Sequence, residues 1–526
     1  MTAAFTLVLH SHLPYVRGAG RWPHGEEWVH EAILATYLPL LVALHDLRAE
    51  GVRFRLVLGL TPILLEQLAD SDIDRRFLEY VQDQIARADT DANRLADEGS
   101  DQPALVAADY RARYTALRDA YVHRFSRDLC SAFASLARSG EVEILTSAAT
   151  HGYLPLLDDV SVDSQLRIGR ASSARLLGIA PTSIWLPECA YRPGLERALE
   201  RNGLTHFFTD PHLLSDRATA RVSIPPQAER SGGALAHERT PRGSGDGADA
   251  ARPYLVGSSP VAVIARHDEL SLRVWSSVYG YPGDPAYREF HRKDPRTGLR
   301  YWRVTGPAAP LGEKSEYVIE DARARVTSHA EHFLGGVRAA CAVAADDGFV
   351  VAAFDAELFG HWWYEGVEWL TAVLRGLAAA CIPTRTAAEH LALHPPSERV
   401  ALAEGSWGKG NDHSTWMNDQ TAWMFDELAT MAQRLAVITA LPLVPEHERF
   451  RARAARQAAR ELLLAQSSDW PFLVTTGQAS EYASERFRSH AQRFSRALAL
   501  AQDGTPANDA ELTTLEGIDN PFPDAT

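Results

Sequence analysis

The sequence has few cysteines, and they stand apart from one another. Cys130, Cys189, Cys341 and Cys381 form no CxxC pair among the 526 residues. This spacing offers neither a thiolate zinc site nor a disulfide framework, and it is typical of proteins of the reducing cytosol. The sequence therefore predicts a cytoplasmic location, and we expect neither a bound metal nor another cofactor.

Long apolar runs and an excess of positive charge are also missing. No apolar run approaches the roughly 18 residues that a membrane span needs, and residues 1–9 lack the charged start and long apolar stretch of a secretion signal. The net charge is −15, with a pI of about 5.7, which disfavours nucleic acid and anionic membranes as partners. No internal repeat is visible. We expect a soluble protein, a monomer, with an uncharged substrate and with no nucleic-acid or membrane partner.

Aromatic residues, in contrast, are plentiful. The chain has 12 Trp and 16 Tyr, and many of them stand in clusters with polar residues. Indole and phenol rings stack on the apolar faces of sugars, so these clusters suggest a carbohydrate ligand, although aromatic residues are also common in protein cores.

Short apolar strands alternate with helical periods along the first 400 residues. The expected strands are residues 6–9, 54–61, 140–147, 183–187, 205–210, 261–264, 271–275 and 349–354. The expected helices between them are residues 30–50, 163–177, 193–202 and 317–345. This alternation predicts parallel βα units and an α/β barrel.

Two helical regions do not follow that alternation. Residues of about 71–139 have a helical pattern with many charges, which predicts a helical excursion on the barrel surface. After residue 400 the alternation ends, and residues 401–526 are expected to form a C-terminal helical domain that contributes to the active-site cleft. Its tail, residues 503–526, is expected to be partly disordered.

Polar side chains follow several of the expected strands at the point where each strand ends. His10 and His12 follow the first strand and His151 the third, while Glu188 and Asp355 follow residues 183–187 and 349–354. The active sites of α/β barrels lie at the carboxyl ends of their strands. Two carboxylates there are the minimum set for cleaving a glycosidic bond, by inversion or retention. The residues themselves leave open which carboxylate has which role, and whether the histidines bind a metal or a hydroxyl.

Five segments of the chain, taken in order, resemble glycoside hydrolase family 57, and within it the 1,4-α-glucan branching enzymes. These segments are His10–Tyr15, Glu143–Pro155, Trp185–Tyr191, Phe354–Gly366, and Ser406–Gly408 through Trp416. The stretch Val274–Phe290 is also similar to that subgroup, and the resemblance spans residues of about 5–430.

The resemblance implies an incomplete (β/α)7 barrel with a helical C-terminal domain that closes over the site. It implies that Glu188 is the nucleophile and Asp355 the general acid/base. The implied reaction transfers an α-1,4-glucan segment, held as an ester on Glu188, to the 6-hydroxyl of an acceptor glucan, which forms an α-1,6 branch. The implied substrate-binding residues are His10, His12, His151, Trp275, Trp407 and Trp416. Glu357 and His361 are interpreted as residues that stabilise the turn after Asp355.

One stretch departs from the family pattern and keeps alternatives open. Branching enzymes of this family carry a flexible loop with a tyrosine at its tip, thought to shield the intermediate from water. The corresponding stretch, of about 213–260, is rich in Gly, Asp and Ala and has one tyrosine, Tyr254. An α-1,4-glucan hydrolase or a 4-α-glucanotransferase of the same family is therefore the main alternative. A metal-dependent deacetylase-like barrel that uses His10 and His12, and a catalytically silent glucan-binding protein, are more remote.

Overall fold

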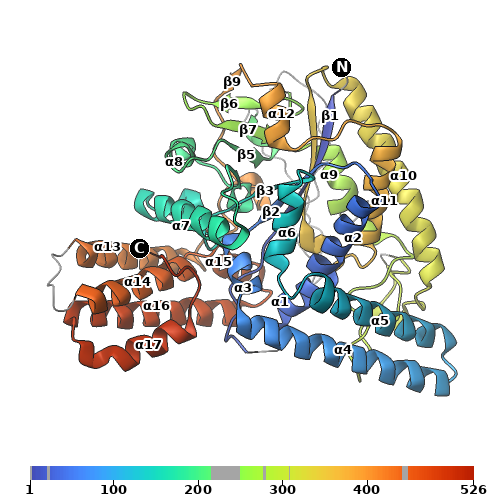
Figure 1. Ribbon diagram of the computed structural model, residues 1–526, viewed down its shortest axis with the longest axis horizontal. Coiled ribbons are helices and arrows are strands. Elements are labelled where there is room, and N and C mark those ends of the chain that lie inside the picture. Colours follow the sequence, from blue (N-terminus) through green and yellow to red (C-terminus); the bar gives the residue numbers. More distant parts are fainter. Residues whose placement is uncertain are drawn as a thin grey trace.

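A curved sheet of parallel strands forms the centre of the molecule, and two groups of helices extend from different corners of the molecule. The structure is a computed structural model that describes residues 3–20, 24–214, 249–276, 280–306, 308–440 and 448–525. A hairpin of the two helices α4, Ser71–Asp97, and α5, Asp101–Asp119, extends from one corner, and the C-terminal helices occupy another (Figure 1). Helix α15, Asp469–Thr476, lies between the other C-terminal helices and the strands (Figure 1).

Seven parallel strands follow one another in the order β8-β1-β2-β3-β4-β5-β7. Their bounds are β1 Ala4–Ser11, β2 Leu56–Leu60, β3 Val142–Leu145, β4 Ser183–Trp185, β5 His206–Thr209, β7 Ala262–Ala265 and β8 Phe349–Asp355. An isolated bridge between Thr146 and Ile184 joins β3 to β4. Between β7 and β8, at the two ends of this order, His267 N donates to Val351 O at 2.7 Å. The incomplete (β/α)7 barrel that the resemblance implied is confirmed.

Two short strands extend the sheet beyond the barrel. Strand β6, Tyr254–Val256, pairs antiparallel with β7, and β9, Arg399–Val400, pairs parallel with β6. They bring the segment just before residue 401 against the barrel edge.

The side chains of β1 and β8 alternate between the barrel interior and the surrounding helices, as the two-residue period of a strand requires. Those that pack outward against the helices are Phe5, Leu7, Leu9, Val350, Ala352 and Phe354. Those that fill the interior, with partners from the other strands, are Ala4, Val8, Phe349, Val351, Ala353, Val57, Leu145, Trp185, Phe208 and Ile264. His10 and Asp355 continue the inward series of their strands, and they are paired in register. The alternation therefore carries both side chains to the mouth of the barrel.

Helices cover the outer surface of the strands. They are α1 Glu27–Ala32, α2 Leu38–Ala49, α3 Pro62–Leu68, α6 Leu129–Arg138, α7 Asp159–Leu177, α8 Leu195–Arg201, α9 Asp268–Trp275, α10 Ile319–Val343, α11 Gly366–Ala379 and α12 Ala387–Leu393. A π-helical turn, Ile33–Tyr37, connects α1 to α2. The helical stretch Glu26–Ala49 is long and apolar enough to cross a membrane, and 67% of its most apolar window is buried within the fold. Burial of this kind is typical of a core helix.

The expected helical excursion is a hairpin of two long helices. Helix α4, Ser71–Asp97, begins where the Asp70 side chain accepts hydrogen bonds from the backbone of residues 72 and 73, and α5, Asp101–Asp119, returns along it. The cap satisfies amide groups that a helix start leaves without partners.

One expected strand is a helix. Residues 271–275 alternate in a way that favours a strand, but they belong to α9, Asp268–Trp275. The buried residues of this helix, Leu270, Ser271 and Val274, have helical spacing, and the His267 side chain accepts from Leu270 N at its start. Packing against the barrel thus outweighs a short β-like pattern.

The C-terminal helices begin after residue 421. They are α13 Ala422–Thr439, α14 Glu448–Ala465, α15 Asp469–Thr476, α16 Ser480–Asp503 and α17 Asp509–Ile518. The tail that was expected to be partly disordered differs from that expectation, because α17 buries Leu512 and Leu515 against α14 and α16. Further on, Phe522 packs with Tyr15 from the barrel. Although the tail has many charged residues, its few buried apolar residues are enough to pack it against the rest of the protein.

Candidate active site

Three histidines and two carboxylates meet at the carboxyl ends of the barrel strands. His10 is the last inward-facing residue of β1 and His12 follows that strand, His151 follows β3, Glu188 follows β4, and Asp355 ends β8. His10 Nε2 lies 3.1 Å from His151 Nε2, and the rings of His12 and His151 stack with centroids 3.9 Å apart. The structure thus brings together the residues that follow separate strands in the sequence.

The backbone at two of these positions has left-handed geometry. His151 has a φ of 57°, and Glu188 and the adjacent Cys189 have φ values of 61° and 48°. Residues other than glycine adopt such angles at a cost, and they gather at functional sites where the surrounding structure holds them. Trp407 N supplies part of that support, because it donates to Glu188 O at 3.1 Å.

The Glu188 carboxylate has partners from outside the barrel. Trp407 Nε1 donates to Oε2 at 2.8 Å, and Ser468 Oγ lies 3.5 Å from Oε1. His151 Nδ1 lies 3.7 Å from the same Oε1. Burial raises the pKa of Glu188 to about 7, while the hydrogen bond from Trp407 acts in the opposite direction. The pKa of Glu188 therefore lies near neutral pH, and one of its carboxylate oxygens is held by the indole of Trp407.

Asp355 has a different electrostatic environment. Burial raises its pKa well above the ordinary value, and the nearby charges of Glu357 and Glu188 raise it further, against the opposing effect of Arg266. A carboxyl group in this environment keeps its proton at pH values where an exposed aspartate has lost it. Two carboxyl groups that interact, one of them favoured as the acid, suit acid/base and nucleophilic roles.

The three histidines are not equivalent. Burial, and then the charge of His12, lower the pKa of His10 and of His151 well below the ordinary value. Burial opposes the charge of His12, but the pKa of His12 is raised, because attraction to Asp469, a hydrogen bond with it and the charges of Glu188 and Glu357 together outweigh that effect. The site therefore favours one imidazolium beside two neutral rings.

Sequence reasoning missed Ser468 and Asp469. His12 Nε2 lies 3.0 Å from Asp469 Oδ2, and His151 Nδ1 lies 2.9 Å from Ser468 Oγ. Ser468 ends the turn that follows α14, and Asp469 is the first residue of α15. The run Ser467-Ser-Asp-Trp470 between two helical patterns was the available signal, since small polar residues that interrupt apolar helices gather at caps and sites.

Glu357 lies behind the site. Its Oε1 accepts from His12 N at 3.1 Å and from the Tyr37 hydroxyl, and burial raises its pKa to about 7. His361 lies farther along the same turn, with Nδ1 3.9 Å from a Glu31 oxygen. These contacts fit the interpretation of Glu357 and His361 as residues that stabilise the turn.

The three tryptophans expected to stack on sugars have different surroundings. Trp275 Nε1 donates to Ala353 O at 3.2 Å, and its ring lies 6.2 Å from that of Trp407 at an angle of 70°. Both rings are partly exposed. Trp416 is only 1% exposed and stacks on Tyr153 with ring centroids 4.4 Å apart. In this structure the Trp416 ring is thus covered by protein, and its expected role as a stacking wall stays a prediction.

The stretch of about 213–260 is only partly described. Residues 215–248, and with them most of the expected flexible loop, lie outside the described residues. Tyr254 lies in β6, is buried, and accepts a hydrogen bond from Asp249 N at 2.9 Å. Tyr254, the one tyrosine of this stretch, is therefore part of the strand that extends the sheet.

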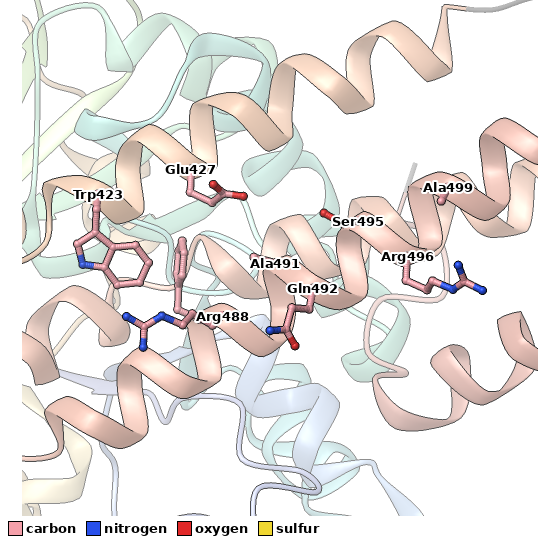
Figure 2. A pocket seen from close by; sticks show the side chains of 9 residues that line it. Trp423, Glu427, Arg488, Ala491, Gln492, Ser495, Arg496 and Ala499 are labelled. Atoms are coloured by element: carbon pink, nitrogen blue, oxygen red, sulfur yellow. The ribbon is translucent and has the colours of Figure 1, made fainter.

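The C-terminal helices also carry a surface hollow (Figure 2). Its lining comes from α13 and α16 alone, namely Trp423, Glu427, Phe487, Arg488, Ala491, Gln492, Ser495, Arg496 and Ala499. None of the barrel's strand-end residues belongs to it, so this hollow is distinct from the candidate active site.

Comparison with known protein families divides the chain into two matches. Residues 6–403 match the model for glycosyl hydrolase family 57. Residues 428–526 match the model described as 1,4-alpha-glucan branching enzyme, C-terminal.

Individual relatives agree with these matches over nearly the whole chain. The 1,4-alpha-glucan branching enzyme of Thermococcus kodakarensis is 38% identical, over 99% of this chain and 78% of the relative. A probable 1,4-alpha-glucan branching enzyme of Mycobacterium tuberculosis is 35% identical, over 96% of this chain and 94% of the relative.

Solved structures show the same relationship. The crystal structure of the Thermococcus kodakaraensis family 57 branching enzyme superimposes with a TM-score of 0.88, covering 100% of this chain and 96% of that one at 38% identity. The alpha-amylase AmyC of Thermotoga maritima is 28% identical, with a TM-score of 0.81 and coverage of 100% and 98%.

Proposed function

This chain belongs to glycosyl hydrolase family 57, and we propose that it acts as a 1,4-α-glucan branching enzyme. One observation carries the proposal: Trp407 and Ser468, which follow the barrel in the sequence, both contact the Glu188 carboxylate at the barrel mouth. The C-terminal helices that complete this site match the branching-enzyme C-terminal model. The relatives named branching enzymes span nearly the whole chain.

In the first step, Glu188 is the nucleophile. Its carboxylate attacks the anomeric carbon of an α-1,4-linked glucan, the bond to the glycosidic oxygen breaks, and Asp355 gives its proton to that oxygen. The chain beyond the cut leaves with a free 4-hydroxyl, and the transferred segment stays as an ester on Glu188. The raised pKa of Asp355 supports the role of proton donor.

In the second step, Asp355 is the base. Its carboxylate takes the proton of a 6-hydroxyl on an acceptor glucan, whose oxygen attacks the anomeric carbon and displaces Glu188. The product is an α-1,6 branch, and both carboxyl groups return to their starting states. Two displacements at one carbon retain the anomeric configuration.

The histidines and the partly exposed tryptophans are proposed to bind the sugars. His10, His12 and His151 would hold hydroxyls of the sugar at the point of cleavage, and hydrogen bonds of this kind strengthen as charge develops in the transition state. Trp275 and Trp407 present partly exposed rings near Glu188 that suit stacking on glucose faces.

The wider setting is part of the same proposal. A neutral, glycogen-like glucan as donor and acceptor, a monomeric enzyme and a cytoplasmic location agree with the acidic composition. They also agree with the four free cysteines, since free thiols are typical of reducing compartments.

Incubation with amylose tests the proposed function. The expected product has α-1,6 linkages, which a debranching enzyme cuts into shorter chains, while the number of reducing ends stays close to its starting value. Reducing ends that rise without new branches would identify an α-1,4-glucan hydrolase. Chains of new lengths without either change would identify a 4-α-glucanotransferase.

A further inference from the structure

A turn of the C-terminal helices enters the barrel mouth. This turn consists of residues 467 and 468 together with Asp469, the first residue of α15, and the backbone of Ser467 forms an antiparallel bridge with Gly152. Ser468 N donates to His151 O at 3.2 Å. Trp470, which is fully buried, fixes the turn from behind by donating from Nε1 to Leu464 O at 2.8 Å. The turn is therefore anchored on both sides.

From this geometry we propose that Ser468 and Asp469 are positioning residues for the catalytic site. Asp469 holds His12, and Ser468 holds Glu188 together with His151. The barrel's nucleophile and histidines are then aligned when the C-terminal helices are seated on the barrel. The inference rests on the proposed roles of Glu188 and Asp355, and it adds two residues to them.

Asp469 holds His12 through both of its carboxylate oxygens. Oδ1 and Oδ2 lie 3.2 Å and 3.0 Å from His12 Nε2, and the other ring nitrogen, Nδ1, lies 3.2 Å from Thr61 Oγ1. The ring is thus fixed at both nitrogens, one by the barrel and one by the C-terminal turn. Asp469 is 17% exposed and opens α15, where a helix start favours a negative charge.

Ser468 connects the nucleophile to a second histidine. Its Oγ lies 2.9 Å from His151 Nδ1 and 3.5 Å from Glu188 Oε1. The hydrogen bond to Glu188 favours the carboxylate form, and so lowers the pKa of that group. Trp407 fixes the other carboxylate oxygen. Glu188 is consequently oriented by two side chains that lie outside the barrel strands.

The charge of His12 depends on several groups. The carboxylates that face it are Asp469, Glu188 and Glu357, and the neighbouring rings are His10 and His151. Asp469 contributes the largest attraction and is the one carboxylate hydrogen-bonded to the ring. Replacing Asp469 with a neutral residue therefore favours loss of the His12 proton at a lower pH. An imidazolium supports Glu188 as a carboxylate, because its charge lowers the pKa of that group.

If Ser468 and Asp469 only docked the helices on the barrel, their replacement would change the pH profile of the rate differently from a loss of positioning. Loss of docking lowers the rate by the same factor at every pH, and it lowers the unfolding temperature. Loss of positioning moves a limb of the pH profile, because each residue holds a different titrating group.

The test measures kcat/KM against pH as the fall in iodine staining of amylose. This readout follows loss of long α-1,4 chains by branching or hydrolysis, so a failure of the branching assignment does not obscure it. The variants are Asp469→Asn and Ser468→Ala, with Asp426→Asn on the exposed face of α13 as the control. For Asp469→Asn we expect the alkaline limb to move to lower pH, because His12 then loses its proton at a lower pH. The expected shift is roughly one pH unit, the lower end of the effect of an adjacent opposite charge. For Ser468→Ala we expect the acid limb to move up and the alkaline limb to stay.

Unfolding temperatures of all three variants are measured alongside the profiles. The proposal would be overturned if the pH profiles of Asp469→Asn and Ser468→Ala both kept the limbs of the parent, whether or not kcat/KM fell by a constant factor. If Asp469→Asn does not fold, Ser468→Ala decides, because it removes a single oxygen atom from the same turn. An acid limb that does not move in that variant would then overturn the proposal.

Discussion

The indole Nε1 of Trp407 donates a hydrogen bond to Oε2 of Glu188 at 2.8 Å. Trp407 belongs to the segment that follows the barrel strands, and its ring packs on the interior cluster of the barrel. The hydrogen bond stabilises the ionised carboxylate, in which form Glu188 can attack a sugar. In the proposed mechanism, the barrel's nucleophile is therefore supported by a residue beyond the last barrel strand.

Replacing Trp407 with Phe removes this hydrogen bond and keeps an aromatic ring. The pKa of Glu188, already raised to about 7 by burial, should rise further because the bond from Trp407 lowers it. Since the carboxylate is the reactive form, the acid limb of kcat/KM against pH moves to higher pH. The loss of one preorganised hydrogen-bond donor also lowers kcat by about 10²–10³ at most.

Trp275→Phe is the matched control for that variant. Trp275 donates to Ala353 O rather than to Glu188, so its replacement should weaken sugar binding and raise KM without moving the acid limb. An acid limb that stays in place in Trp407→Phe, or moves equally in both variants, would contradict the assigned role of the Trp407 hydrogen bond.

Glu188→Gln should increase stability at alkaline pH. The folded-state pKa of Glu188 is raised from 4.5 to about 7, so the contribution of this group to the stability of the parent is greatest below pH 4.5 and is lost as pH rises through about 7. The amide cannot ionise and avoids that loss. The variant should gain about 2–4 kcal/mol over the parent at pH 8, and nothing at pH 4, because one pKa unit corresponds to 1.36 kcal/mol.

Unfolding temperatures across this pH range measure the effect. Glu143→Gln is the control of opposite sign, because His206 lowers the pKa of that carboxyl, although burial acts in the other direction. It should be less stable than the parent above about pH 4.5, and this difference should shrink as pH falls through the lowered pKa of the folded state. A Glu188→Gln variant whose unfolding temperature depends on pH as the parent's does would show that the folded state does not raise the pKa of Glu188.

Asp355→Asn should slow cleavage of glucan by about 10²–10⁴, the usual contribution of a general acid. A substrate such as α-maltosyl fluoride needs no proton on its leaving group, so formation of the Glu188 ester from it should slow far less. Comparing the burst rates on the two substrates checks the assignment. Equal losses on both would mean that Asp355 does not protonate the leaving oxygen.

Activity should survive exhaustive chelation with EDTA. The ring nitrogens of His12 are committed to Thr61 and Asp469, and those of His151 to His10 and Ser468, so they are engaged as hydrogen-bonding groups. Rates on amylose before and after dialysis against chelator measure this. Loss of activity that a divalent metal restores would favour the deacetylase-like alternative.

The strand-end residues could be predicted from the sequence, because a strand's two-residue period is local. His10 and Asp355 are the last inward residues of β1 and β8, and the apolar runs before them mark both strands clearly. Their neighbourhood follows from the parallel order of the sheet. For this reason the barrel and its five clustered polar residues followed from pattern and resemblance together.

The contributions of the C-terminal helices could not be predicted in the same way. Ser468 and Asp469 are more than 100 residues from Asp355, and their contacts depend on how α14 and α15 dock on the barrel. Trp416 stands in a polar-aromatic loop that suggested an open stacking wall, yet its ring is covered by Tyr153. Burial of a ring is decided by its three-dimensional neighbours, which a local pattern does not contain.

Trapping the covalent intermediate tests the central claim, that Glu188 is the nucleophile, most directly. The enzyme is incubated with a 5-fluoro-α-maltosyl fluoride, digested with pepsin, and examined by mass spectrometry. The expected result is one sugar-bearing peptide whose fragments place the ester on Glu188, and no labelled peptide in Glu188→Gln. A label on Asp355 or Glu357, or equal labelling of the Glu188→Gln variant, would contradict the proposed mechanism.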